Sequence, residues 1–161
     1  MANPATIALD AIDIRILNAL QQNGRITITD LAERAGLSPS PCLRRVKLLE
    51  ERGVIAGYVA VVDQNRVGLA VNVFASIRLE RQREEELERF ALAVSRWPEV
   101  MECYLMTGTR DYLMRIVVSS LAEYERFIKD KLSRLEGVAS IESSFALSRV
   151  KHTTVVPVSA G

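Results

Sequence analysis

The sequence contains few of the residues from which metal sites, disulfide networks and catalytic sets are built. Its 161 residues include two cysteines, one histidine and 6% aromatic residues. Cys42 and Cys103 lie 61 positions apart, and His152 lies near the end of the chain. These numbers and spacings predict neither a zinc site nor a disulfide framework, so we expect no metal, no cofactor and no catalytic residues.

The sequence also lacks a long apolar run. The longest stretch without a charged side chain, residues 67–77, has 11 residues, whereas a membrane-spanning helix needs roughly 20. Residues 1–9 contain no Lys or Arg and no long apolar run, so they do not resemble a secretory signal. We therefore expect a cytoplasmic protein that does not interact with a membrane.

The overall composition is that of an ordinary folded protein, with 48% apolar and 25% charged residues. At roughly 100 to 200 residues per domain, the length allows one domain or two small ones. With 21 basic against 20 acidic residues the net charge is +1, which gives no overall attraction to nucleic acid. Local charge is uneven, because residues 34–52 contain five basic and only two acidic side chains.

Three segments near the amino terminus have helical patterning. Apolar residues recur at helical spacing from about residue 10 to 22, where Asp10 is the expected N-cap and Gly24 lies at the stop. A two-turn helix over residues 29–35 ends at Gly36.

A third helix is predicted to open at Ser38-Pro39 and to run to about Arg52. The serine hydroxyl is expected to cap the unpaired amides, and proline suits the first turn because its missing N–H is no loss there. Residues 54–63 are rich in β-branched side chains and predict a strand pair, or wing. The first part of the chain is therefore expected to be three helices and a ribbon.

From residue 71 the pattern changes to alternating strands and amphipathic helices. Strands are expected at residues 71–80, 100–107, 112–119 and about 139–150, and helices at residues 87–97, ended by Pro98, and 121–135, stopped at Gly137. This β-α-β-β-α-β order predicts a ferredoxin-like four-stranded sheet with both helices on one face. The other face would expose apolar side chains such as Phe74 and Leu105 or their alternates, and dimerisation through it would cover them.

The segment from residue 29 to 52 has the proportions of a helix-turn-helix, with Gly36 at the bend. On its second helix Cys42, Val46 and Leu49 form one stripe, whereas Ser40, Arg44 and Lys47 form the opposite stripe, with Arg45 adjacent. An exposed helix with arginines near its first turns suits the major groove of DNA, where arginine pairs bidentately with guanine. The alternative interpretation is a solvated basic face, and for Cys42 burial is favoured over redox sensing.

These motifs resemble those of the Lrp/AsnC family of feast/famine regulators. The resemblance covers residues 9–151 and is most specific in the run Leu37-Ser38-Pro39-Ser40-Pro41-Cys42-Leu43-Arg44-Arg45-Val46, with Glu102-Cys103, Thr107-Gly108 and Asp111-Tyr112-Leu113 in the second half. It implies an α+β protein with a winged helix-turn-helix at residues 9–63, a linker at 64–70 and a ferredoxin-like effector-binding and oligomerisation domain at 71–151. Residues 1–8 and 152–161 would be tails.

The resemblance also implies a function. It is that of a sequence-specific transcriptional regulator that binds double-stranded DNA at a pseudo-palindromic site. The regulator would respond to a small molecule, which the resemblance implies to be an amino acid, bound between dimers that assemble into tetramers or octamers. The implied DNA-facing residues are Ser38, Ser40, Arg44, Arg45 and Lys47, and the implied effector loop is Thr107, Gly108, Thr109, Arg110 and Asp111.

The effector loop has a second interpretation. An amino acid presents an ammonium and a carboxylate, to which Asp111 and the Gly108 amide offer complementary groups. In a purely structural hairpin, Asp111 would cap backbone amides and Gly108 would adopt a positive φ. Many members of the family carry Asp directly after the glycine, where this chain has Thr109 followed by Arg110. The class of effector therefore stays open. Arg110 could instead form an ion pair across a dimer interface.

Two other functions stay open at the level of sequence. An architectural DNA-binding protein would bind or bend DNA without sensing an effector, although the net charge near zero argues against simple coating of DNA. The second alternative is an enzyme, because some siroheme decarboxylases look similar to this chain in both halves. Such chemistry requires positioned acid and base groups. The single histidine, His152, follows the last predicted strand and offers no such set.

Overall fold

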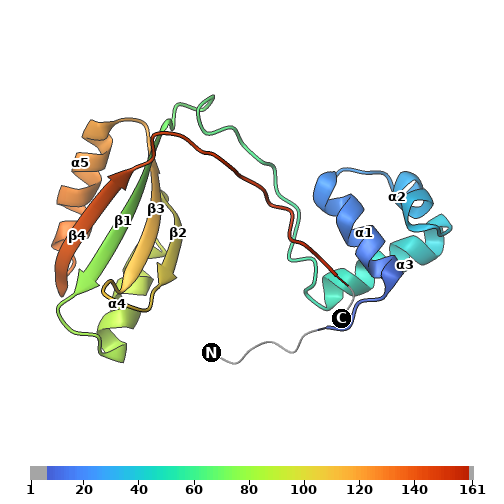
Figure 1. Cartoon of the computed structure of the whole chain (residues 1–161), viewed down its shortest axis with the longest axis horizontal. Helices are drawn as coiled ribbons and strands as arrows, with labels where there is room; N and C mark the ends of the chain where they lie inside the picture. Colours follow the sequence, from blue (N-terminus) through green and yellow to red (C-terminus); the bar gives the residue numbers. More distant parts are fainter. Residues whose placement is uncertain (1–6, 160–161) are drawn as a thin grey trace. The chain divides into compact units, whose positions relative to one another are not determined.

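The computed structural model describes residues 7–159 and divides the chain into two compact units. The first unit contains the chain up to Ala60 together with the segment from Lys151 onward, and the second unit is Val61–Val150 (Figure 1). The predicted tail at residues 1–8 therefore lies, except for residues 7 and 8, outside the described residues. Within the described part, no helix is long and apolar enough to cross a membrane.

The first unit is built from three helices, as the sequence predicts: α1 (Ala11–Gln22), α2 (Ile28–Ala35) and α3 (Pro39–Glu51). Asp10 caps α1 and accepts hydrogen bonds from the Ile12 and Asp13 amides, both at 2.8 Å. Gly36 ends α2 in the left-handed conformation, with φ of 73°, which permits the tight bend into α3. The buried stripes of the three helices form one core that includes Ile16, Leu31, Ala35, Cys42 and Leu49.

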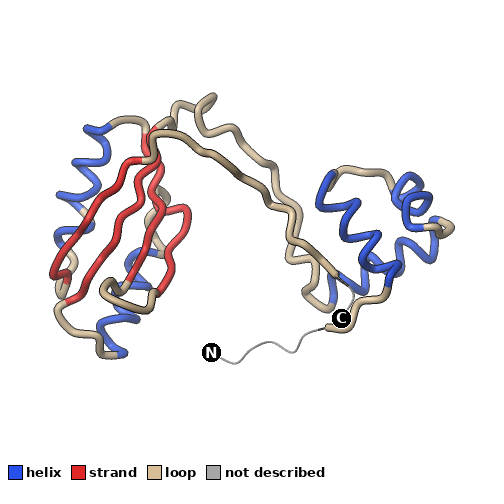
Figure 2. The backbone as a smooth tube through the Cα atoms, viewed as in Figure 1, coloured by secondary structure: helices blue, strands red, loops and turns tan. Residues whose placement is uncertain are grey.

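Two predictions for this part of the chain are wrong. Ser38 is the N-cap of α3, but its hydroxyl makes no capping hydrogen bond. Residues 54–63 form no strand and run as an irregular segment with exposed valines, drawn as loop in Figure 2; Val59 is 88% exposed. Their β-branched composition favours extended backbone, but a strand also needs a partner strand to take up its hydrogen bonds, and none pairs with them among the described residues.

The second unit has the predicted βαββαβ order and is a four-stranded antiparallel sheet with strand order β2-β3-β1-β4. Its elements are β1 (Val71–Leu79), α4 (Glu84–Val94), β2 (Val100–Leu105), β3 (Tyr112–Val118), α5 (Leu121–Asp130), the short 3-10 helix η1 (Leu132–Arg134) and β4 (Val138–Phe145). Phe90 and Val94 of α4 and Tyr124 and Phe127 of α5 belong to the same core as the buried strand residues. Both helices therefore cover one face of the sheet.

The remaining differences concern where elements end. α4 ends at Val94, before Pro98, and α5 gives way to η1 before Gly137. β4 ends at Phe145 rather than at residue 150. Phe145 pairs with Val73, and β1 begins at Val71, so the residues after Phe145 run past the start of their partner strand.

The uncovered face carries Phe74 and Tyr104, which are 39% and 54% exposed. Leu105 pairs with Tyr112, whose side chain is in the core, so Leu105 lies on the helix side and its neighbour Tyr104 occupies the uncovered face. Arg115 on the same face donates hydrogen bonds to Glu102 at 3.2 Å and to Asn72 at 3.2 and 3.3 Å. The face therefore combines apolar side chains with an ordered polar network.

Candidate functional site

Helix α3 presents one buried and one exposed side. Cys42, Val46 and Leu49 are 0%, 8% and 2% exposed and pack into the core of the first unit. Ser38, Ser40, Arg44 and Lys47, four of the five residues expected to face DNA, are all exposed. Since the core stripe fixes the rotation of α3, the polar stripe is held toward solvent. Burial raises the pKa of the Cys42 thiol, as expected for a packing residue.

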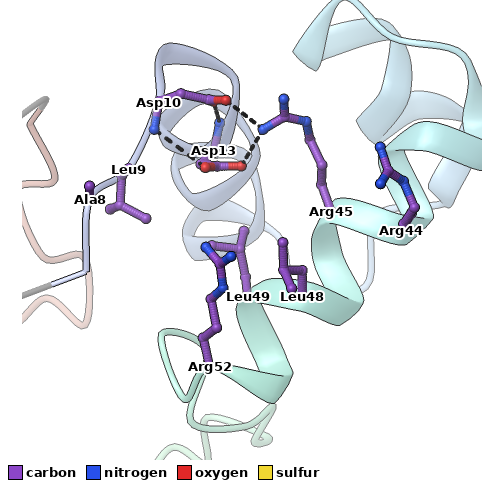
Figure 3. Close-up of a pocket in the computed structure, with 9 residues that line it drawn as sticks. All are labelled: Ala8, Leu9, Asp10, Asp13, Arg44, Arg45, Leu48, Leu49 and Arg52. Carbon is purple, nitrogen blue, oxygen red and sulfur yellow. Dashed lines mark hydrogen bonds and ion pairs between the residues drawn. The ribbon is translucent and has the colours of Figure 1, made fainter.

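Arg45, the fifth residue expected to face DNA, is bound within the unit. Its guanidinium donates hydrogen bonds to a carboxylate oxygen of Asp10 and to one of Asp13, both at 2.7 Å (Figure 3). The Arg45 and Asp13 side chains are only 29% and 14% exposed. The hydrogen bonds to Asp10 and Asp13 raise the pKa of Arg45. The pKa of Asp10 is lowered, first by the amide of Asp13 and then by Arg45.

This arrangement connects α3 to the start of α1. Asp10 and Asp13 form a capping box, in which each carboxylate accepts a hydrogen bond from the backbone amide of the other residue. The same two carboxylates receive the Arg45 guanidinium. The sequence predicts the Asp10 cap but not this second role, because the local spacing of Asp10 and Asp13 carries no information about a partner 32 positions away from Asp13.

A cavity of about 480 Å³ lies between the start of α1 and the second half of α3. It is lined by Ala8, Leu9, Asp10, Asp13, Arg44, Arg45, Leu48, Leu49 and Arg52 (Figure 3). Both carboxylates in it are taken by Arg45, whereas Arg44 and Arg52 have no acidic partner within ion-pair distance among the described residues. Arg52, which the motif did not include, therefore adds positive charge beside the exposed stripe of α3.

The effector loop between β2 and β3 is anchored at its end by Asp111. This residue is 7% exposed, and its carboxylate accepts a hydrogen bond from the Leu79 amide at 2.7 Å. The Asp111 amide donates to the Ile77 carbonyl, and the Asp111 carbonyl accepts from the Met106 amide, both at 2.8 Å. Asp111 therefore caps a backbone amide, and Gly108 has φ of 106°, as the structural interpretation of the hairpin predicts.

The other loop residues differ in their surroundings. Thr107, Gly108 and Thr109 are exposed. Arg110 donates hydrogen bonds to the Ser140 hydroxyl at 3.0 Å and to the Glu142 carboxylate, both on β4 of the same chain. The structure thus gives Arg110 an ion-pair partner on the uncovered face of its own sheet, where the sequence suggested a partner across a dimer interface. The backbone and threonine groups of residues 107–109 are the accessible part of the loop.

Comparisons with known proteins agree with both units. Residues 9–56 match the model of the winged helix-turn-helix DNA-binding family, and residues 72–156 match that of the Lrp/AsnC ligand binding domain. The chain is 45% identical over 150 residues to the Bkd operon transcriptional regulator of Pseudomonas aeruginosa, covering 93% of this chain and 98% of that protein. It is 42% identical over 146 residues to the leucine-responsive regulatory protein of Haemophilus influenzae, covering 91% and 88%.

A solved structure gives the same result. The crystal structure of a transcriptional regulator from Neisseria meningitidis in complex with L-Met superposes with a TM-score of 0.88 at 42% sequence identity. The match covers 92% of this chain and 96% of that one. The fold expected from the sequence, a helix-turn-helix followed by a ferredoxin-like unit, is therefore shared with solved regulators over nearly the whole chain.

Proposed function

Because the chain belongs to the Lrp/AsnC family of DNA-binding transcriptional regulators, we propose that it binds DNA through the exposed stripe of α3 and responds to an amino acid bound at its β2–β3 loop. The observation that supports DNA binding is that α3 has a polar, exposed stripe on one side and a buried stripe packed in the core on the other. The proposed DNA contacts are Ser38, Ser40, Arg44 and Lys47, which are exposed. Arg45 is proposed to position α3 through Asp10 and Asp13 rather than to contact DNA.

The chemistry of the stripe fits duplex DNA. Arginine near the first turns of an exposed helix can read guanine in the major groove, while serine and lysine hold phosphates. The chain as a whole carries a net charge of only +1, so its affinity depends on this local cluster, to which Arg52 adds. Binding should therefore fall steeply with salt, by a slope of about −0.9 per phosphate contact in a logarithmic plot.

The proposed assembly is a homodimer formed through the uncovered face of the sheet. Phe74 and Tyr104 are exposed there, and a second copy would remove them from water. A two-fold protein places two copies of α3 on successive major grooves, so the DNA site should be a pseudo-palindrome with half-sites roughly 34 Å apart. We propose that further assembly of dimers, to tetramers or octamers, forms the complete effector site.

The proposed effector is an amino acid, since the related regulator from Neisseria meningitidis was crystallised with L-Met. Residues 107–109 are the exposed part of the loop and offer backbone amides and threonine hydroxyls to a carboxylate. Asp111 is proposed to fix the base of the loop, because its carboxylate is committed to the Leu79 amide.

Two experiments test these proposals on the full chain. Selection from a random duplex library should recover a pseudo-palindromic site, and recovery of no preferred sequence would contradict sequence-specific binding. Thermal melting with each of the twenty amino acids, starting with L-Met, should show stabilisation by one or a few of them. A ligand at one hundred times its dissociation constant adds about 2.7 kcal/mol.

The effector experiment has a matched control. Thr109→Ala should reduce the shift caused by the effector, whereas Ser119→Ala, also exposed but outside the loop, should leave it unchanged. Absence of a shift with every amino acid would contradict amino-acid sensing and favour an architectural DNA-binding protein.

A further inference from the structure

Residues 156 and 158, which follow the second unit in the sequence, are bound to the first unit. The Gln21 side chain near the end of α1 makes two hydrogen bonds to the backbone of Val156: its amide nitrogen donates to the Val156 carbonyl at 3.1 Å, and its amide oxygen accepts from the Val156 amide at 2.6 Å. Val158, two residues further on, is partly buried against the core of the same unit. In Figure 1 the segment drawn in red after β4 leads to these helices.

These contacts have the features of a specific docking. A side-chain amide that both donates to and accepts from one residue satisfies its two backbone groups together, as a neighbouring strand would. Val156 is held through its backbone and the residue is 65% exposed, whereas Val158 contributes apolar packing. The docking therefore combines a bidentate polar contact on α1 with a hydrophobic contact two residues later.

The other segment that leaves the first unit is also bound to it. The Tyr58 hydroxyl donates a hydrogen bond to the Glu50 carboxylate at the end of α3, at 3.0 Å. The Tyr58 ring lies beside Gly24, where an added Cβ would come within 3.5 Å of the ring. The helices of the first unit are thus contacted by Tyr58, which precedes the second unit in the sequence, and by Val156, which follows it. The second unit itself is the continuous segment Val61–Val150.

We infer that residues 155–158 are a strap that completes the DNA-binding unit, which is a two-segment domain. This differs from the C-terminal tail at residues 152–161 that the resemblance implies. It also differs from the matches to the two family models. The DNA-binding model matches residues 9–56 only, and the ligand-binding model matches residues 72–156, which include residues 155 and 156. The strap holds α1, and α1 in turn holds α3 through Asp10, Asp13 and Arg45.

Hydrogen exchange on the full-length protein tests this inference. Two variants weaken the strap: a chain ending at Thr154, and Gln21→Ala. The matched control is Gln22→Ala, which removes an exposed glutamine at the next position of α1. Slowly exchanging amides of α1, α2 and α3 should exchange about five- to thirtyfold faster in both strap variants, corresponding to the loss of one or two net interactions. They should be unchanged in Gln22→Ala, and amides of β1 and β3 should be unchanged in all three variants.

Equal exchange in the shortened chain and the wild type would overturn the inference. So would faster exchange in Gln22→Ala to the same degree as in Gln21→Ala, because the contact would then not be specific. A second measurement, affinity for the selected DNA site, rests on the proposed function: the shortened chain should bind more weakly than Gln22→Ala. If the wild type selects no DNA site, the proposed function fails, and the exchange measurement still decides whether the strap exists.

Discussion

Replacing Arg44 or Arg45 by alanine should separate a DNA contact from a residue that positions the helix carrying it. The two arginines are adjacent on α3, but only Arg45 is bound by Asp10 and Asp13. We expect Arg44→Ala to weaken specific DNA binding and to leave the stability of the first unit unchanged. We expect the reverse for Arg45→Ala.

The magnitudes follow from exposure. Loss of an arginine that contacts a base or phosphate weakens binding by about 1 to 3 kcal/mol, which is about 5- to 150-fold. The Arg45–Asp13 ion pair is partly exposed, so solvent screening limits its contribution to about 1 kcal/mol or less. For a unit of this size, 1 kcal/mol lowers the melting temperature by about 4 to 8 °C. A unit stable by several kcal/mol stays almost fully folded after such a loss, and its DNA affinity should change less than about threefold.

The assay combines calorimetric melting with DNA titrations at several salt concentrations. Arg44→Ala should also reduce the dependence on salt if it contacts a phosphate, whereas Arg45→Ala should not. Asp13→Asn should reproduce the lower melting temperature of Arg45→Ala, since it removes the charge of the less exposed carboxylate. A positioning role for Arg45 would be excluded if Arg45→Ala weakened DNA binding as much as Arg44→Ala while leaving the melting temperature unchanged.

Three further predictions concern other parts of the chain. Asp111→Ala should lower the free energy of unfolding of the second unit by about 1 to 3 kcal/mol, because the buried Leu79 amide loses its acceptor, and Asp111→Asn by less; equal losses in chemical denaturation would contradict this. Burial and the hydrogen bond to Glu50 raise the pKa of Tyr58 to about 12, so its stabilising contribution is full below the unfolded value of about 10 and is lost as the pH rises to about 12. The difference in melting temperature between wild type and Tyr58→Phe should therefore shrink over that range, and a constant difference would exclude the contact. Cys42 is 0% exposed, so it should react with thiol reagents only as fast as the first unit unfolds; rapid labelling of the native protein would contradict its burial.

The sequence predicts those features that depend on neighbouring residues. Asp10 lies next to the amides it caps and Gly36 next to the bend it permits, so both helix boundaries are readable locally. The apolar residues at every second position of β1 likewise predict which of its side chains face the core. The strand pair expected at residues 54–63 does not form, because strand formation also depends on a partner strand that sequence composition does not specify.

The features that could not be predicted depend on contacts between distant residues. Arg45 looks like a DNA contact on the helix, and only the fold shows that Asp10 and Asp13 reach it. Similarly, Asp111 has the charge expected of a ligand contact, but the fold commits its carboxylate to Leu79. In each case the partner of the charged residue lies on another element, which the local sequence does not specify.

The strap also has a consequence for synthesis of the protein on the ribosome. Domains usually complete folding in the order in which they emerge, with the amino-terminal domain first. Here the second unit is continuous from Val61 to Val150, whereas the first unit needs residues near the end of the chain. The second unit can therefore be complete while the first unit still lacks residues 155–158. A chain truncated before these residues during translation would contain an intact second unit and an incomplete DNA-binding unit.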